Sequence, residues 1–343
     1  MLNKPDLLSL NFDEVKNLIS LSGEADYKAK QVYLWARKGI DSFDEMSNVS
    51  KSLREKLEGN TYLATVRIER KFVSKIDGTV KYLFKLSDGA FIEGVLMKYK
   101  HGYSMCISSQ VGCRMGCNFC ASTLLGLERN LTAGEMLGQI IKAQNDNNIR
   151  ISNIVLMGMG EPLDNFDNVL RFLELVSDKD GLSVGHRHIS LSTCGRVDGI
   201  YKLLEYNLQI TLSVSLHAPF DDMRTGMMPI NKKYNIEKLL CACKDYTDKT
   251  HRRISFEYSL IEGLNDTKEC AQKLAFLLKG ILCHVNLIPI NEVKEREYKK
   301  SKNVYNFQKM LTEKGINATV RRTLGSDIDA SCGQLRQRIK NEL

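Results

Sequence analysis

The sequence predicts an α/β fold in which a parallel sheet follows a small helical region and a β-rich extension. After about residue 100, short apolar runs alternate with amphipathic segments six times in succession, which is the pattern of repeated strand–helix units. Before that point the texture changes from helical spacing to β-rich runs. We therefore expect a helical region at 1–60, an extension at 61–98, an α/β core at 99–333 and a tail at 334–343.

The first 60 residues are expected to be helical. In residues 22–39, apolar side chains recur three or four positions apart up to a glycine, as in an amphipathic helix. Residues 50–59 begin with a serine, a suitable N-cap, and also end at a glycine. In the β-rich extension, Asp88-Gly89 lies between two runs, and this dipeptide predicts a hairpin turn.

The core is expected to alternate strands with helices. Strands are expected at residues 103–109, 152–158, 188–193, 209–216, 253–260 and 284–290, with 317–323 as a late addition. Helices are expected at residues 132–144, 168–177, 197–206, 235–246, 267–280 and 304–315. Thr132 and Glu135 have the spacing of a capping box at the start of the first helix. An open doubly wound sheet and a partial barrel both fit this order.

Polar or glycine-bearing loops follow five of the expected strands. They are the cysteine loop at 111–120, GMGEP at 158–162, STCG at 192–195, SLHAP at 215–219 and PIN at 289–291. Because the carboxyl ends of parallel strands meet at one edge of a sheet, we expect these loops to share a site.

Composition indicates a globular cytoplasmic protein. The chain of 343 residues is 43% hydrophobic and 26% charged, and no apolar run approaches the roughly 18 residues that span a bilayer. The N-terminus lacks a signal-peptide core. We therefore expect no membrane partner, and ten reduced cysteines that are available for metal binding or catalysis.

The net charge of +8 permits an RNA partner without requiring one. Basic clusters neutralise phosphates, although isolated pairs are also common on ordinary surfaces. The basic pairs are Lys232-Lys233, Arg252-Arg253, Lys299-Lys300 and Arg321-Arg322.

Three cysteines, Cys113, Cys117 and Cys120, lie within eight residues in a Cys-x₃-Cys-x₂-Cys pattern. Structural zinc takes four protein ligands, and no fourth cysteine or histidine follows closely. Three thiolates suit a [4Fe–4S] cluster that leaves one iron open to a small chelating ligand. A zinc loop is the alternative interpretation.

This pattern, with Phe119 before the last cysteine, resembles the signature of the radical S-adenosylmethionine (AdoMet) enzymes. The resemblance implies a partial (β/α)₆ barrel, a [4Fe–4S] cluster, and AdoMet cleaved to a 5′-deoxyadenosyl radical. It also implies AdoMet contacts from the strand-end loops. These are Gly160, Glu161, Ser192, Ser215, Leu216, His217 and Asn291. By themselves, the two serines fit strand-end capping and His217 fits a satisfied core histidine.

Two further segments, CISSQVGC at 106–113 and DIDASCGQL at 327–335, resemble the dual-specificity RNA methyltransferases that methylate an adenine carbon, the RlmN/Cfr group. The resemblance runs from about Glu93 to Gln334. It implies that Cys332 carries a methyl group from one AdoMet and that a second AdoMet supplies the radical. It also implies that Cys106 attacks the Cys332 sulfur, which releases the methylated base and leaves a transient disulfide.

The resemblance further implies that Glu93 accepts the ring proton. Alternation along residues 90–97 places Glu93 on the face opposite Ile92, so the residues alone predict an outward-facing strand position.

The other five cysteines are expected to be buried and inert. They are Cys194, Cys241, Cys243, Cys270 and Cys283.

The implied substrate is adenosine C2 in large-subunit ribosomal RNA, with an adenosine beside the anticodon of some tRNAs as a second target. A monomer served by an electron donor such as flavodoxin or ferredoxin is expected. Methylation at C8 is the nearest alternative, although Val111, Pro162 and the segment PINKKYN at 229–235 favour C2. A non-catalytic, zinc-stabilised RNA-binding module is the alternative from another class.

Overall fold

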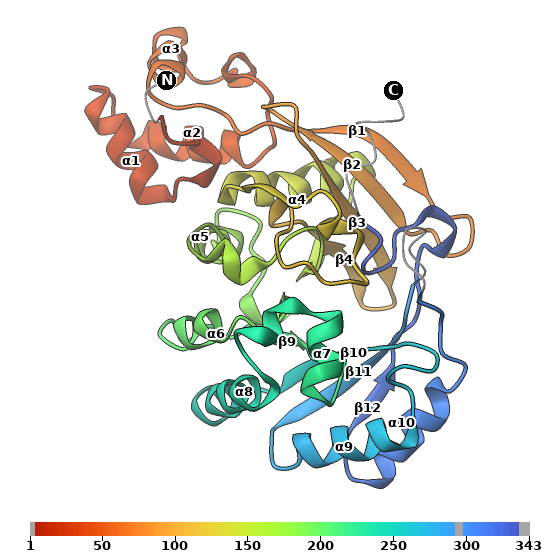
Figure 1. Cartoon of the computed structure of the whole chain (residues 1–343). Coiled ribbons are helices and arrows are strands. Elements are labelled where there is room, and N and C mark those ends of the chain that lie inside the picture. Colours follow the sequence, from red (N-terminus) through yellow and green to blue (C-terminus); the bar gives the residue numbers. More distant parts are fainter. Residues whose placement is uncertain (1–3, 292–297, 336–343) are drawn as a thin grey trace.

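A computed structural model of the chain describes residues 4–291 and 298–335. Within these residues, ten strands form one sheet in the order β1-β2-β3-β4-β7-β8-β9-β10-β11-β12 (Figure 1). The strands are β1 (Val66–Val73), β2 (Val80–Leu86), β3 (Phe91–Tyr99), β4 (Gly102–Cys106), β7 (Ile151–Leu156), β8 (Ile189–Thr193), β9 (Thr211–Ser215), β10 (Ile254–Leu260), β11 (Cys283–Pro289) and β12 (Ala318–Val320). From β4 to β12 each neighbouring pair is parallel.

The predicted strand–helix alternation is confirmed. The core helices are α4 (Ala133–Asn147), α5 (Phe166–Ser177), α6 (Val197–Leu203), α7 (Asp221–Met227), α8 (Ile236–Thr250), α9 (Lys268–Leu278) and α10 (Val304–Glu313). In Figure 1 they form an arc along the outer side of the parallel strands. Because β1 and β12 occupy the two edges, the sheet remains open, and the α/β fold is the predicted partial barrel.

The β-rich extension joins the main sheet. Its strands β1, β2 and β3 pair antiparallel, and β3 in turn pairs antiparallel with β4, with Val95 opposite Cys106. The sheet therefore continues without a break across residues 98 and 99, and the division of the chain at this point stays a prediction. Of the expected tail, residues 336–343 lie outside the described residues.

Two local predictions in the extension and the core are correct. Gly89 has a φ of 85° in the turn between β2 and β3, and the Leu86 N–H donates to the Ala90 carbonyl at 2.8 Å. The capping box at the start of α4 is also present. The Glu135 N–H donates to Thr132 Oγ1 at 3.1 Å, and the Thr132 N–H donates to Glu135 Oε2 at 2.9 Å.

The N-terminal region consists of the helices α1 (Phe12–Leu21), α2 (Tyr27–Ala36) and α3 (Lys51–Asn60). The helix expected from residue 22 begins only at Tyr27, because residues 22–24 form the turn that ends α1. The region packs beside α4 and α5 (Figure 1). Arg171 on α5 forms an ion pair with Glu14 on α1 at 2.8 Å. No helix in the described part of the chain is both long and apolar enough for a membrane span.

Two elements of the core were not predicted. The short helix α7 follows the SLHAP loop, and a separate two-stranded sheet forms from β5 (Gln110–Gly112) and β6 (Leu127–Asn130). This small sheet closes the cysteine loop at its base, where the Cys113 N–H donates to the Gly126 carbonyl at 2.8 Å. A Cβ at Gly112 would lie 2.0 Å from that carbonyl oxygen, so the closure requires glycine.

Candidate active site

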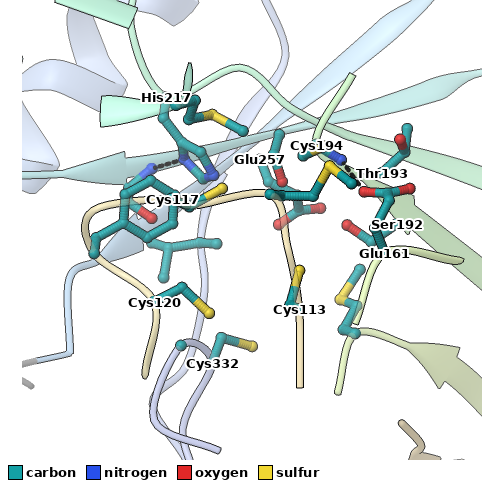
Figure 2. Close-up of a pocket in the computed structure, with 18 of the residues that line it drawn as sticks. Cys113, Cys117, Cys120, Glu161, Ser192, Thr193, Cys194, His217, Glu257 and Cys332 are labelled. Carbon is teal, nitrogen blue, oxygen red and sulfur yellow. Dashed lines mark hydrogen bonds between the residues drawn. The ribbon is translucent and has the colours of Figure 1, made fainter. Parts of the chain in front are cut away.

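A cavity of about 150 Å³ lies at the carboxyl ends of the parallel strands. Its lining includes Cys113, Cys117 and Cys120, and it also includes residues of each loop that was expected to share a site. Figure 2 shows the cysteine loop around one side of this cavity, with Glu161, Ser192 and Thr193 on the other side. The structure therefore brings together loops that are separated by long stretches of sequence, as the parallel order of the strands predicted.

The three thiols of the cysteine loop are poorly exposed. Burial raises the pKa of each thiol above its ordinary value, and the neighbouring cysteines add to the effect. Binding of iron would therefore have to displace protons. Within residues 4–291 and 298–335, no three His, Cys, Asp or Glu side chains are arranged around a single-ion site. The three thiols instead border a shared space.

The GMGEP loop is held tightly against the start of β5. Gly160 has a φ of +102°, and a Cβ there would lie 2.6 Å from the Cβ of Gln110. The Glu161 carboxylate accepts hydrogen bonds from the Cys194 N–H at 2.7 Å and the Leu163 N–H at 3.0 Å. Burial raises the pKa of Glu161, while these donors oppose the shift. Glu161 thus links the loops after β7 and β8 and also lines the cavity.

His217 is a neutral residue at the wall of the cavity. Its Nδ1 accepts the Ser259 N–H at 2.9 Å, and burial together with Arg224 lowers its pKa to about 3. The ring packs edge-on against Phe119, with centroids 4.7 Å apart. His217 therefore helps to position the cysteine loop as well as lining the cavity.

The remaining expected AdoMet contacts divide into two groups. Ser192, Ser215 and Asn291 line the cavity. Leu216 is fully buried and is not part of the lining. The Leu216 N–H donates to the Glu257 carbonyl at 3.1 Å. Its expected contact with AdoMet stays a prediction.

Cys332 lies on a C-terminal loop that docks against the cysteine loop. The Ala121 N–H donates to the Gly333 carbonyl at 2.8 Å, and Asn291 Nδ2 donates to the Cys332 carbonyl at 3.1 Å. Figure 2 shows the Cys332 and Cys120 side chains beside one another. Cys332 is only partly buried.

Cys106 does not reach the main cavity. It lies at the end of β4 and lines a second, smaller cavity of about 40 Å³, which Cys332 and Arg321 also line. Burial and the neighbouring Cys332 raise the pKa of the Cys106 thiol to about 12, and Arg321 opposes the shift. Both cysteines are free thiols. Cys332 is thus common to the two cavities.

Glu93 is buried, so the outward-facing position that strand alternation predicted is wrong. The residue is 2% exposed. Its face of the sheet also carries Lys81 and Cys106, because both lie opposite Val95 in the neighbouring strands. The C-terminal loop covers this face, and Lys81 Nζ donates to the Asp329 carbonyl at 3.3 Å. The alternation of residues within β3 could not predict this burial, because the loop that covers Glu93 lies more than 200 residues further along the chain.

Three charged residues of the site were not predicted. Arg321 lines both cavities, whereas its basic pair with Arg322 had suggested a phosphate contact or an ordinary surface position. Its Nη1 lies 3.8 Å from Oε2 of Glu257, a buried carboxylate of the cavity wall. Arg224 is fully buried and donates to the carbonyls of Cys194 at 2.8 Å and Ser215 at 3.1 Å. Arg321 directly follows β12, so the strand-end rule could have found it.

The five cysteines expected to be inert have varied environments. Cys243 and Cys270 are buried in helices, as expected. Cys241 is exposed and Cys283 is only partly buried, so the predicted burial is wrong for these two residues. Cys194 is buried but lines the main cavity.

Comparisons with known proteins match most of the chain. A family model described as the radical SAM superfamily matches residues 107–274, and one described as the ribosomal RNA large subunit methyltransferase N-terminal domain matches residues 5–63. A protein of Alkaliphilus metalliredigens named "Probable dual-specificity RNA methyltransferase RlmN" is 56% identical over 339 residues, which cover 98% of this chain and 96% of the relative. A protein of the same name from Clostridium tetani is 52% identical and covers 99% of both chains.

A solved structure shares the whole architecture. The crystal structure of a radical SAM methyltransferase from Sphaerobacter thermophilus superposes with a TM-score of 0.91 and 41% identity. The match covers 97% of this chain and 99% of that one.

Proposed function

Since the chain belongs to the RlmN family of AdoMet-dependent RNA methyltransferases in the radical SAM superfamily, we propose that it methylates C2 of one adenosine in large-subunit ribosomal RNA. We propose an adenosine beside the anticodon of some tRNAs as a second substrate. The name dual-specificity RNA methyltransferase, which its relatives carry, supports both substrates.

The observation that carries this proposal is the position of Cys332 at the junction of the two cavities. Adenine C2 is electron-poor and cannot attack a sulfonium methyl group directly. A relay is needed in which a protein thiol first takes the methyl group and later gives up the carbon. Cys332 borders the cysteine loop on one side and shares the smaller cavity with Cys106 on the other, which suits both halves of that relay.

Membership of the radical SAM superfamily implies an iron–sulfur cluster and AdoMet. The donor set fits, since three thiols border one cavity at the strand ends. We propose that Cys113, Cys117 and Cys120 hold a [4Fe–4S] cluster and that AdoMet lies against Gly160 and the loops beside it. When bound, these cofactors supply the 5′-deoxyadenosyl radical, which protein side chains alone could not generate. The expected AdoMet contacts are Gly160, Glu161, Ser192, Ser215, Leu216, His217 and Asn291.

Three side chains perform the remaining steps. Cys332, as a thiolate, takes a methyl group by displacement, and a second AdoMet is used for the radical, so each turnover uses two. After the carbon has joined adenine and the adduct has given its unpaired electron to a one-electron acceptor, Glu93 accepts the proton from C2. Cys106, as a thiolate, then bonds to the Cys332 sulfur. The sulfur–carbon bond breaks, the released carbon takes up a proton to become the methyl group, and a transient disulfide is left that a reductant must reopen.

We further propose a cytoplasmic monomer that receives electrons from a donor such as flavodoxin or ferredoxin. The ten cysteines are all free thiols, which suits a reducing compartment. We also propose that the N-terminal helices α1–α3 and the basic pairs elsewhere in the chain contact RNA. A family model described as the ribosomal RNA large subunit methyltransferase N-terminal domain matches residues 5–63, and the net charge of the whole chain is +8.

The regiochemistry can be tested with the purified, iron-loaded protein and an rRNA fragment. We expect mass mapping of the digested RNA to give 2-methyladenosine. A product of 8-methyladenosine would establish the alternative activity. A protein with stoichiometric zinc and no methylated RNA would establish the zinc-stabilised binding module.

Replacing Cys117 with alanine should remove the cluster. A cluster held at only two corners loses its anchoring geometry, so we expect iron and visible absorbance to fall by about tenfold or more. Iron content after anaerobic loading measures this directly. The control is Cys241→Ala, which removes an exposed thiol outside both cavities and should retain its iron. Full iron retention in the Cys117 variant would mean that other residues hold the cluster.

A further inference from the structure

Lys81 and Glu93 form an ion pair inside the protein, on the face of the sheet that carries Cys106. Lys81 Nζ lies 3.6 Å from Glu93 Oε1, and the two side chains are each 3% exposed. Removal of charges from water is costly, so a buried ion pair is an unusual feature of a protein core. This pair includes the carboxylate that the proposed function uses as a base, and it lies on the same face as Cys106.

The ammonium group of Lys81 also contacts the loop that carries Cys332. Nζ donates to the Asp329 carbonyl at 3.3 Å, three residues before Cys332. It also lies 5.3 Å from the centroid of the Phe72 ring on β1. One side chain therefore bridges the carboxylate on β3 and the loop that brings the methyl carrier to the substrate.

The same loop is anchored a second time by the turn between β1 and β2. Asp327 accepts the Ser74 hydroxyl at 2.6 Å and the Lys75 N–H at 2.9 Å. In return, Asp77 Oδ2 accepts the Gly325 N–H at 2.9 Å. These reciprocal bonds hold residues 325–329 over the face that carries Lys81 and Glu93. When the loop is docked in this way, its Asp329 carbonyl is available to Lys81.

We propose that Lys81 is a positioning residue for removal of the C2 proton. Its ammonium group pairs with the buried Glu93 carboxylate and fixes the orientation of that carboxylate, and its bond to Asp329 makes this arrangement depend on a docked Cys332 loop. In the step concerned, the C2–H bond of the covalent adduct breaks, its electron pair stays in the adenine ring, and the proton passes to a Glu93 oxygen. The unpaired electron that radical addition leaves on the adduct passes to a one-electron acceptor of the iron–sulfur class before the proton leaves, so proton transfer to Glu93 itself moves no further electron.

This inference rests on the proposed function and is specific to one step. Loss of Lys81 should leave methylation of Cys332 intact, because that displacement involves neither Glu93 nor RNA. It should slow only the step after the carbon has joined adenine. A purely structural role would instead lower both reactions together, since both need a folded protein.

The test compares Lys81→Met with Lys81→Arg, and with Lys85→Met as the matched control. Lys85 is an exposed lysine on the same strand. Each full-length, iron-loaded variant reacts with AdoMet and an rRNA fragment that carries deuterium at C2 of the target adenosine. Mass spectrometry measures the methyl group on Cys332, the methylated RNA, and any covalent protein–RNA adduct with its deuterium content.

For Lys81→Met we expect methylation of Cys332 within about twofold of the unsubstituted protein and RNA methylation lower by at least about tenfold. A protein–RNA adduct that retains deuterium should accumulate. Lys81→Arg should restore most of the RNA methylation, and Lys85→Met should match the unsubstituted protein. If Lys81→Met does not fold, Lys81→Gln, which keeps a hydrogen-bond donor, undergoes the same measurements. We again expect nearly normal methylation of Cys332 and strongly reduced methylation of RNA.

Several outcomes would overturn the proposal. These are RNA methylation by the neutral variant at the rate of Lys85→Met, an adduct that has lost its deuterium, and an equal loss of both methylations. If the unsubstituted protein forms no 2-methyladenosine, the proposed function itself fails. If the unsubstituted protein is active and the neutral variant equals the control, only the role of Lys81 fails.

Discussion

Cys332→Ala should abolish transfer of the AdoMet methyl group to the protein and to RNA alike. The thiolate is the nucleophile in the first displacement, and alanine provides no sulfur to carry the carbon onward. Loss of a covalent nucleophile reduces turnover by about a thousandfold or more. AdoMet with a labelled methyl group measures both transfers in one reaction, since protein and RNA can be separated before counting.

Loss of methyl transfer in this variant can be attributed to the missing thiol, because the substitution should not unfold the protein. Cys332 is only partly buried on a loop, so alanine there should change the free energy of unfolding by about 0.5 kcal/mol or less. The control is Cys241→Ala, because Cys241 is exposed on α8 and lines neither cavity. We expect the control to keep its full activity. Methylated RNA from the Cys332 variant would end the thioether mechanism.

Cys106→Ala should trap a covalent protein–RNA adduct. Without the second thiol, the sulfur of Cys332 cannot be attacked and the methylated base cannot leave. Turnover should stop after the first addition, with about one RNA bound per protein. A band of raised mass on a denaturing gel, which nuclease treatment removes, is the measurement. Release of 2-methyladenosine at the usual rate would exclude Cys106 from the release step.

The different environments of the two thiols agree with different roles. Cys106 is buried and lines only the smaller cavity, and burial raises the pKa of its thiol, whereas Cys332 is partly buried and also lines the main cavity. Cys332 is therefore the thiol placed to accept the first methyl group. The burial of Cys106 also calls for a matched control. Cys243→Ala removes another buried thiol, on α8 and outside both cavities. We expect this control to lose some stability, by about 1 kcal/mol, but to release product normally.

The partial barrel and most of the main cavity could be predicted from the sequence. Strands and helices differ in the period of their apolar residues, and this period can be recognised within each short segment of the sequence. The strand-end rule also predicts Glu161 and His217, which lie in the loops after β7 and β9. Arg321 directly follows β12 and obeys the same rule, but its basic pair with Arg322 indicated only a phosphate contact or an ordinary surface position.

The sequence by itself therefore determined the strand–helix order, the three-cysteine loop and the edge of the sheet where the loops meet, because each depends on short-range spacing. Only the tertiary structure decided that Glu93 is buried, that Lys81 pairs with it, and that the loop before Cys332 lies against Lys81. The physical reason is that these contacts depend on the register of β2, β3 and β4 and on a C-terminal loop folded across them. Neither the strand register nor the docking of the loop produces a periodic pattern in the sequence of the residues that become buried.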